Sequence, residues 1–196
     1  MALQIGITGG IGSGKSLVCK IFNCLGAPSY DADSLAKRLM TTDGILVEAI
    51  KKEFGSLSYH SDGRLNNGFI RSIVFNNKER LQALNALVHP RVAADYAQWA
   101  EENAKQPYII REAALLFESG SARLQDKVIV VSAPETIRIA RVLKRDPQRS
   151  ETEVRNIIKS QMREEEKLKR ADFIVLNDDT RLVIPQVVEL HQQFLG

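Results

Sequence analysis

A glycine-rich segment near the start of the chain carries the clearest chemical signal. Residues 9–16 read Gly-Gly-Ile-Gly-Ser-Gly-Lys-Ser, which fits the pattern G-x-x-x-x-G-K-[ST]. Glycines let a backbone wrap closely around a phosphate chain, so that N–H groups and the N-terminus of the next helix face it. Lys15 would then reach the β- and γ-phosphates, and the Ser16 hydroxyl would bind the bridging magnesium. We expect an ATP site made by Gly9, Gly10, Ile11, Gly12, Ser13, Gly14, Lys15, Ser16 and Leu17.

Two carboxylates follow at a second expected strand end. Asp31 and Asp33 are separated by one residue, so they point the same way if the backbone is extended. One could take the proton of an acceptor hydroxyl while the other orders magnesium through water. Alternatively, Asp33 only caps the helix that begins at Ser34. The spacing leaves both interpretations open.

These residues need a sheet to position them. Apolar, β-branched runs separated by helical patterns are typical of parallel strands that helices cover on both faces. We therefore expect an α/β protein of the P-loop NTPase type, with a five-stranded parallel sheet flanked by helices. The expected strands are Leu3–Thr8, Ala27–Tyr30, Tyr108–Ile110, Val128–Val131 and Phe173–Leu176.

The sequence predicts one domain with two inserted parts. The expected core comprises residues 1–32, 106–140 and 171–196, with a helical acceptor-binding insertion over about 33–105 and a lid over about 141–170. The helical patterns of the insertion are broken by a turn near Asp62 and by His89-Pro90. The lid segment holds ten Lys and Arg against six Asp and Glu. That surplus predicts either a solvated helix or a cationic element that closes over phosphates.

Composition narrows the class of protein. The 196 residues with 44% hydrophobic content suffice for one sizeable core. The apolar runs are far shorter than the roughly 18 residues that a membrane span needs, and the N-terminus shows no secretory pattern. We therefore expect a cytoplasmic protein without a membrane partner. Cys19 and Cys24 are five residues apart on an expected helix, which favours reduced packing residues.

Other P-loop classes fit less well. Asn77-Lys78-Glu79-Arg80 lacks the aspartate of a guanine-specific N-K-x-D motif, and the strand near Ile110 leads to Glu112 rather than to the aspartate typical of motors. Nucleic-acid binding is disfavoured because aromatic residues make up only 6% of the chain. A non-catalytic nucleotide sensor stays open, and no obligate protein partner is evident. A small-molecule kinase fits best.

The motifs, taken in order, resemble the dephospho-coenzyme A kinase family. The resemblance covers nearly the whole chain and includes an Ala171-Asp172 pair near the last strand. The matching segments are Thr8–Ser16, Asp31–Asp33, Leu84–Pro90 with the pattern L-N-x-L-x-H-P, and Leu115–Glu118 with L-L-F-E.

The resemblance implies transfer of the ATP γ-phosphate to the ribose 3′-hydroxyl of dephospho-coenzyme A, with Mg²⁺ present. Asp33 is then the expected base, and His89, Leu115 and Glu118 are expected with it at the acceptor. Arg141 matches the lid arginine that neutralises the transferring phosphoryl group or stacks beside adenine. Arg145 and Arg149 are weaker matches. Another small-molecule or nucleotide kinase is the alternative.

The chain departs from the family pattern at two positions. Ala114 and Glu112 stand where the family usually has Pro and often Asp. Glu112 keeps a carboxylate, so we expect a magnesium shell of Ser16, Asp31 and Glu112, with a structural pairing of Glu112 as the alternative. Asn177, after the last expected strand, either contacts adenine or belongs to an Asn-Asp-Asp turn. His89 by itself reads as a helix-boundary residue.

Overall fold

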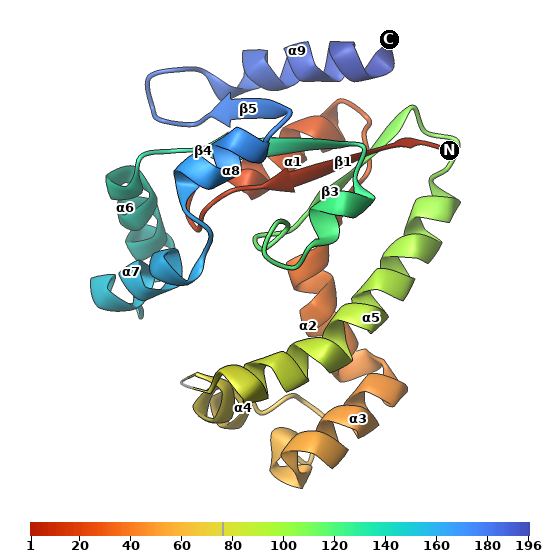
Figure 1. Cartoon of the computed structure of the whole chain (residues 1–196), viewed down its shortest axis with the longest axis vertical. Coiled ribbons are helices and arrows are strands. Elements are labelled where there is room, and N and C mark those ends of the chain that lie inside the picture. Colours follow the sequence, from red (N-terminus) through yellow and green to blue (C-terminus); the bar gives the residue numbers. More distant parts are fainter. Residues whose placement is uncertain (76) are drawn as a thin grey trace. The chain divides into compact units, whose positions relative to one another are not determined.

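The computed structural model describes residues 1–75 and 77–196. They form two compact units, which we call the core unit (Met1–Asp31 with Glu102–Gly196) and the helical unit (Ala32–Glu101). Figure 1 shows the elements of both units along the chain.

The core unit is built on one sheet of five parallel strands, which confirms the predicted fold class (Figure 1). The strand order is β2-β3-β1-β4-β5, so β1 lies at the centre with β3 and β4 beside it. The strands are β1 (Leu3–Thr8), β2 (Ser29–Asp31), β3 (Tyr108–Glu112), β4 (Lys127–Ser132) and β5 (Phe173–Leu176).

Alternation along the strands separates the two faces of the sheet. Ile5 and Ile7 of β1 are buried with residues of α1 (Lys15–Cys24) and α9 (Val183–Leu195), and these two helices pack against each other. Gly6 points to the opposite face, where an added Cβ would meet Leu116 at 2.6 Å. The segment after β3 therefore covers the second face closely, and α8 (Glu164–Arg170) packs there against β4.

The expected lid segment is helical but not continuous. Within it, α7 (Glu151–Ser160) ends before α8, and Gln161 between them is extended. The two helices bury different partners, because Val154 of α7 packs with α6 (Glu135–Arg145) whereas Lys167 of α8 is buried beside Glu118. The remaining element, a short 3₁₀ turn, is Ser121–Leu124.

The helical unit contains a 25-residue helix that runs through Pro90. The prediction of a break at His89-Pro90 was wrong. Proline removes one backbone donor and tends to kink a helix, but Pro90 and Ala86 four residues earlier are both exposed, so water can serve the Ala86 carbonyl. The helix bends along its course in Figure 1. The elements of this unit are α2 (Ala32–Thr42), α3 (Gly44–Phe54), a 3₁₀ turn (Ser56–Ser58), α4 (Asn67–Val74) and α5 (Lys78–Glu102).

Over residues 1–75 and 77–196, no helix is both long and apolar enough to cross a bilayer.

Candidate functional site

The predicted phosphate loop joins β1 to α1 at the carboxyl end of the central strand. Glycine is required at two of its positions for both conformation and space. Gly12 has φ 80° and a Cβ there would lie 2.4 Å from the backbone oxygen of Arg138. Gly14 has φ 98° and a Cβ there would lie 2.1 Å from the side-chain amide of Asn177. The loop is therefore closely packed on its outer side. At these two positions it offers only backbone atoms to a ligand.

Lys15 begins α1 and folds back over this loop. Its Nζ donates to the carbonyl oxygen of Gly9 at 3.1 Å and to that of Gly10 at 3.4 Å. The ammonium group therefore lies over the first residues of the loop, where an entering phosphate oxygen could replace the carbonyls as its partner.

Ser16 connects the loop to the strand carboxylates. Its Oγ donates to Glu112 Oε1 at 2.9 Å. Glu112 ends β3 and pairs in register with Asp31, which ends β2. Two carboxylates and a hydroxyl therefore meet at the carboxyl edge of the sheet, where parallel α/β proteins bind ligands.

The surroundings of Glu112 favour its neutral form. Burial raises the pKa of this carboxyl, the hydrogen bond from Ser16 opposes the rise, and the charge of Asp31 adds to it. Burial also raises the pKa of the Cys19 thiol, which lies beside Glu112, well above its ordinary value. A cation at this edge would reverse the balance by favouring ionised carboxylates.

Magnesium suits this set of oxygen atoms. Within the described chain, no group of three or more His, Cys, Asp or Glu residues is placed to hold a metal ion. Magnesium does not need such a group, because it is usually held by one or two carboxylates together with substrate phosphates and water. The oxygen atoms of Ser16, Asp31 and Glu112 could serve as such a partial shell.

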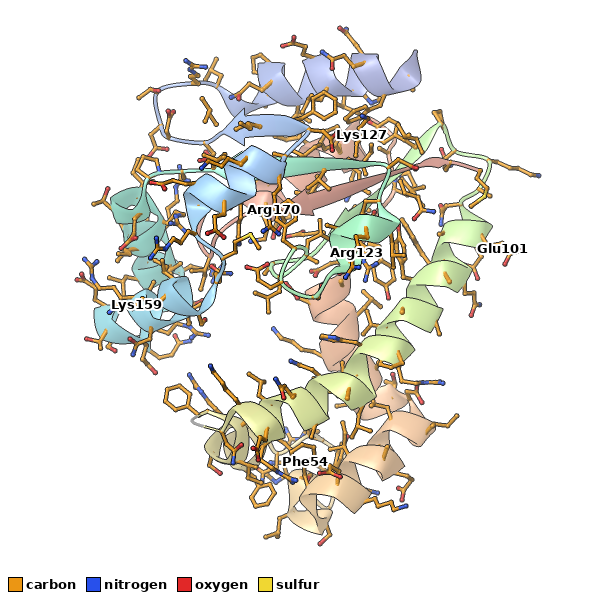
Figure 2. The ribbon with its side chains drawn as sticks, in the orientation of Figure 1. Phe54, Glu101, Arg123, Lys127, Lys159 and Arg170 are labelled. Atoms are coloured by element: carbon orange, nitrogen blue, oxygen red, sulfur yellow. The ribbon has the colours of Figure 1, made fainter. Side chains whose placement is uncertain are left out.

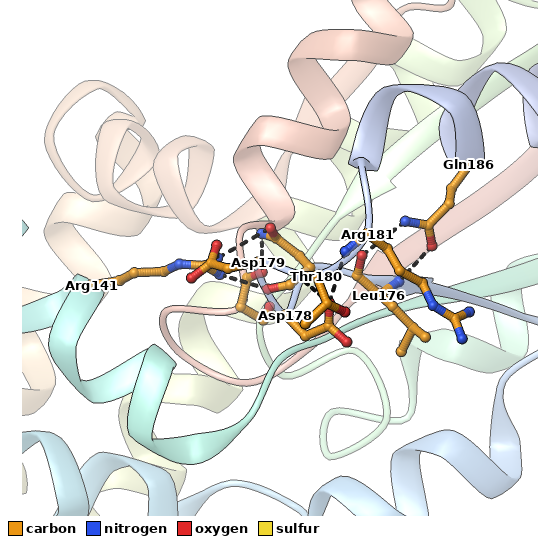
Figure 3. A network of polar contacts seen from close by, with 9 residues as sticks. Arg141, Leu176, Asp178, Asp179, Thr180, Arg181 and Gln186 are labelled. Carbon is orange, nitrogen blue, oxygen red and sulfur yellow. Dashed lines mark hydrogen bonds and ion pairs between the residues drawn. The ribbon is translucent and has the colours of Figure 1, made fainter.

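Arg141 of α6 and Asn177 form a polar network beside the loop (Figure 3). Arg141 donates to the backbone and side-chain oxygens of Asn177 at 3.0 and 3.2 Å, and to Asp179 at 2.6 Å. The Asn177 amide in turn donates to the backbone oxygen of Ser13 at 2.8 Å. Asp178 accepts from Thr180, so the residues after β5 also form the turn that we gave as the alternative.

The other lid arginines have carboxylate partners. Arg145 and Arg149 share Asp146 at 2.9 and 3.3 Å. The basic side chains of this segment also lie on different helices, with Lys159 on α7 and Arg170 on α8 (Figure 2). The charge surplus is therefore spread and partly neutralised.

The expected acceptor residues fall in both units. In the helical unit, Asp33 lies in the first turn of α2, where a carboxylate suits the helix dipole, and His89 is exposed inside α5. In the core unit, Leu115 is exposed. Glu118 Oε1 accepts from the Met162 amide at 2.8 Å and lies 3.2 Å from Lys167 Nζ.

Sequence reasoning missed two residues at the loop. Gln161 Oε1 accepts from the Ile11 amide at 2.9 Å, so the end of α7 is hydrogen-bonded to the phosphate loop. Arg138 lies against Gly10 and Gly12. Both contacts join residues more than a hundred positions apart, and no local pattern in the sequence signals them.

The model of the family described as dephospho-CoA kinase matches residues 3–182, which include the phosphate loop, all five strands of the sheet and the segment 141–170. The chain belongs to the dephospho-CoA kinase family. A curated dephospho-CoA kinase of Porphyromonas gingivalis is 41% identical over 189 residues, which cover 96% of this chain and 92% of that protein.

Solved structures agree with this family assignment. A dephospho-CoA kinase from Campylobacter jejuni has a TM-score of 0.72 and 30% identity, covering 98% of this chain and 97% of its own. The protein TT1252 from Thermus thermophilus has a TM-score of 0.87 and 33% identity, covering 100% of this chain and 98% of its own.

Proposed function

We propose that this chain transfers the γ-phosphate of ATP to the ribose 3′-hydroxyl of dephospho-CoA, giving CoA and ADP. The observation that carries the proposal is the phosphate loop whose Ser16 is hydrogen-bonded to Glu112 beside Asp31. A nucleotide loop joined to a carboxylate pair suits phosphoryl transfer, which depends on positioning and charge stabilisation.

ATP binding follows from the loop geometry. The backbone amides of Gly14–Ser16 and the positive end of α1 would face the phosphates, whereas the Ser13 amide donates to the Gly10 carbonyl within the loop. Lys15 exchanges its two carbonyl partners for oxygens of the β- and γ-phosphates, so a cation already held in place contacts the group that moves. Arg141, fixed by Asn177 and Asp179, lies beside the loop as a nucleotide contact.

Magnesium belongs to the proposed site. Ser16 would hold it directly, with Asp31 and Glu112 in the shell around it. Bound there, it would neutralise charge between the β- and γ-phosphates. The Ser16 hydroxyl would give a lone pair to the metal while its hydrogen stays on Glu112, and Glu112 would ionise.

Asp33 is the proposed base. It follows Asp31 by two residues, and it is an exposed residue in the first turn of α2. It would accept the 3′-hydroxyl proton as the acceptor oxygen attacks phosphorus. His89, Leu115 and Glu118 remain proposed acceptor contacts.

The helical unit offers a place for the rest of the acceptor. A cavity of about 540 Å³ there is lined on one side by Lys37 and Thr41 of α2 and on the other by residues of the segment 60–68. The Tyr59 hydroxyl donates to the Met40 carbonyl at 2.7 Å, which joins the two sides. Of the described residues that line the cavity, none is acidic.

The cavity lies at a distance from Asp33 that suits dephospho-CoA. Asp33, Lys37 and Thr41 recur every four residues, so they share one face of α2 and rise by about 6 Å per step. In the acceptor, five single bonds of about 1.5 Å join the 3′-oxygen to the first 5′-phosphorus, a span of about 6 Å. With the ribose at Asp33, the diphosphate reaches Lys37 and then Arg64.

The proposed function is tested by ADP release from the purified protein with Mg-ATP. Dephospho-CoA is compared with adenosine, a nucleoside monophosphate, shikimate and no acceptor. Turnover that requires dephospho-CoA supports the proposal. Turnover only with a different acceptor would keep the kinase activity and change the assigned substrate. ATP binding without any turnover would favour a nucleotide sensor.

We also propose a cytoplasmic location, where ATP and CoA intermediates are used. Both cysteines are free thiols, with Cys19 buried and Cys24 exposed, which suits a reducing compartment.

A further inference from the structure

Arg138 is a buried cation at the phosphate loop that the mechanism so far does not use. It lies in the first turns of α6, and only 5% of the residue is exposed. A Cβ on Gly10 would fall 1.8 Å from its Nη1, and a Cβ on Gly12 would fall 2.4 Å from its backbone oxygen. Arg138 therefore lies directly across the segment Gly10–Gly12.

The described part of the chain offers no counter-ion for Arg138. Among residues 1–75 and 77–196, no carboxylate lies within ion-pair distance of it, and its buried Nε has no hydrogen-bond partner. Arg141 and Arg145, on the same helix, each have an aspartate. A buried charge without a partner is costly, so the position suits an anion supplied by a ligand.

Two cations converge on the same end of the loop. Lys15 Nζ lies on the carbonyls of Gly9 and Gly10, and the Arg138 guanidinium lies against Gly10 from α6. Lys15 in this motif reaches the β- and γ-phosphates. The second cation is therefore placed where the outermost phosphate of a bound nucleotide lies, whereas Arg141 is turned to Asn177 and Asp179.

We propose that Arg138 contacts the γ-phosphoryl group of ATP and is a catalytic residue of the transfer. The proposal rests on the proposed kinase function. As the bond from the 3′-oxygen to the γ-phosphorus forms, the bond from that phosphorus to the β–γ bridging oxygen breaks, ADP leaves with the electron pair, and the acceptor proton passes to Asp33. The planar guanidinium donates to equatorial oxygens of the moving group and balances its charge.

The first test compares Arg138→Gln with Lys144→Gln, which removes an exposed cation from the same helix. Loss of a preorganised donor to a transition-state charge lowers kcat by about 10²- to 10³-fold. We expect that loss for Arg138→Gln, a partial recovery for Arg138→Lys, and near-normal kcat for Lys144→Gln.

Nucleotide binding separates a γ-phosphate contact from general support of the loop. Calorimetry without acceptor measures Kd for AMPPNP and for ADP, so the result does not depend on which acceptor is correct. Arg138→Gln should reduce the preference for AMPPNP over ADP about tenfold or more, whereas Lys144→Gln should preserve it.

A steric variant gives an independent check. Gly10→Ala places a methyl group where Nη1 now lies, so it should displace the guanidinium and lower kcat as Arg138→Gln does. Arg138→Ala makes room for that methyl group. The loss of kcat in the double variant Gly10→Ala/Arg138→Ala should therefore be clearly smaller than the product of the two single losses.

The result that would overturn the proposal is a folded Arg138→Gln variant, with the Tm of the parent protein, that keeps both its kcat and its AMPPNP-over-ADP preference. A lowered Tm with an unchanged preference in both Arg138→Gln and Arg138→Lys would also overturn it, because Arg138 would then only pack against the loop. Absence of turnover in the parent protein would instead refute the proposed function.

Discussion

Removal of one partner of the ion pair between Glu118 and Lys167 should strongly destabilise the junction between the sheet and the lid segment. Lys167 Nζ lies 3.2 Å from Glu118 Oε1, and the lysine side chain is completely buried while that of Glu118 is 20% exposed. Lys167 Nζ has no hydrogen-bond partner in the described part of the chain, so Glu118 is its main electrostatic support.

Glu118→Gln removes the negative charge and keeps an oxygen that can accept from the Met162 amide. Breaking a buried pair from one side costs about 3–5 kcal/mol, because the other charge stays buried. We expect the lower end, about 3 kcal/mol, since water reaches part of Glu118. In a chain of this length 1 kcal/mol corresponds to about 2–4 °C in Tm, so Tm should fall by roughly 6–12 °C.

The assay is chemical unfolding in urea followed by circular dichroism, with thermal unfolding alongside. Glu118→Gln/Lys167→Met, which removes both charges, should recover most of the loss. Glu118→Ala should be less stable than Glu118→Gln by about 1 kcal/mol, because the Met162 amide also loses its acceptor. A change below about 0.5 kcal/mol in Glu118→Gln, the range of ordinary surface substitutions, would refute this reasoning.

Three further predictions concern the site. Asp33→Asn should lower kcat by at least about 10²-fold with little change in ATP affinity; steady-state kinetics that show a near-normal kcat would remove Asp33 as the base. Glu112→Gln should flatten the pH dependence of stability. The pKa of Glu112 in the folded protein is raised above 4.5, so the parent protein loses stability as pH rises from 4.5 through that folded pKa. Urea unfolding over this pH window should show this loss of stability in the parent protein and not in the variant. Lys37→Gln should raise KM for dephospho-CoA about tenfold, the value of one charge-assisted contact, whereas Lys52→Gln, an exposed lysine outside the cavity, should leave it unchanged; equal KM values would argue against the cavity as the diphosphate site.

The sheet and the phosphate loop were predictable because their signals are local. Runs such as Val128–Val131 are short, apolar and β-branched, and such a run can bury both faces only inside a parallel sheet. The loop motif specifies its own conformation through glycines at positive φ. The strand order, by contrast, depends on which long connections cross the sheet. The sequence pattern does not indicate these crossings.

The wrong or missing predictions concern residues whose tertiary contacts outweigh the local conformational preference of the sequence. Pro90 indicates a helix break in sequence, yet α5 continues through it because the lost hydrogen bond falls on the solvent side. The charge of Arg138 looks like that of any surface arginine on an amphipathic helix. Only the fold shows that β4, which lies beside β1, leads into α6 and that Arg138 then lies against Gly10.

The junction of α7 and α8 imposes a mechanical constraint on the lid segment. Gln161 is hydrogen-bonded to the Ile11 amide and Met162 to Glu118, so two consecutive residues are fastened to two separate loops of the core unit. A rotation of α7 that keeps both bonds must use this junction as its fulcrum, and displacement then grows along the helix toward Ser150. A rotation about any other axis breaks one or both bonds, at about 1 kcal/mol each. A rotation of α7 that keeps both bonds would therefore move its Ser150 end, together with the packed α6, more than its Gln161 end.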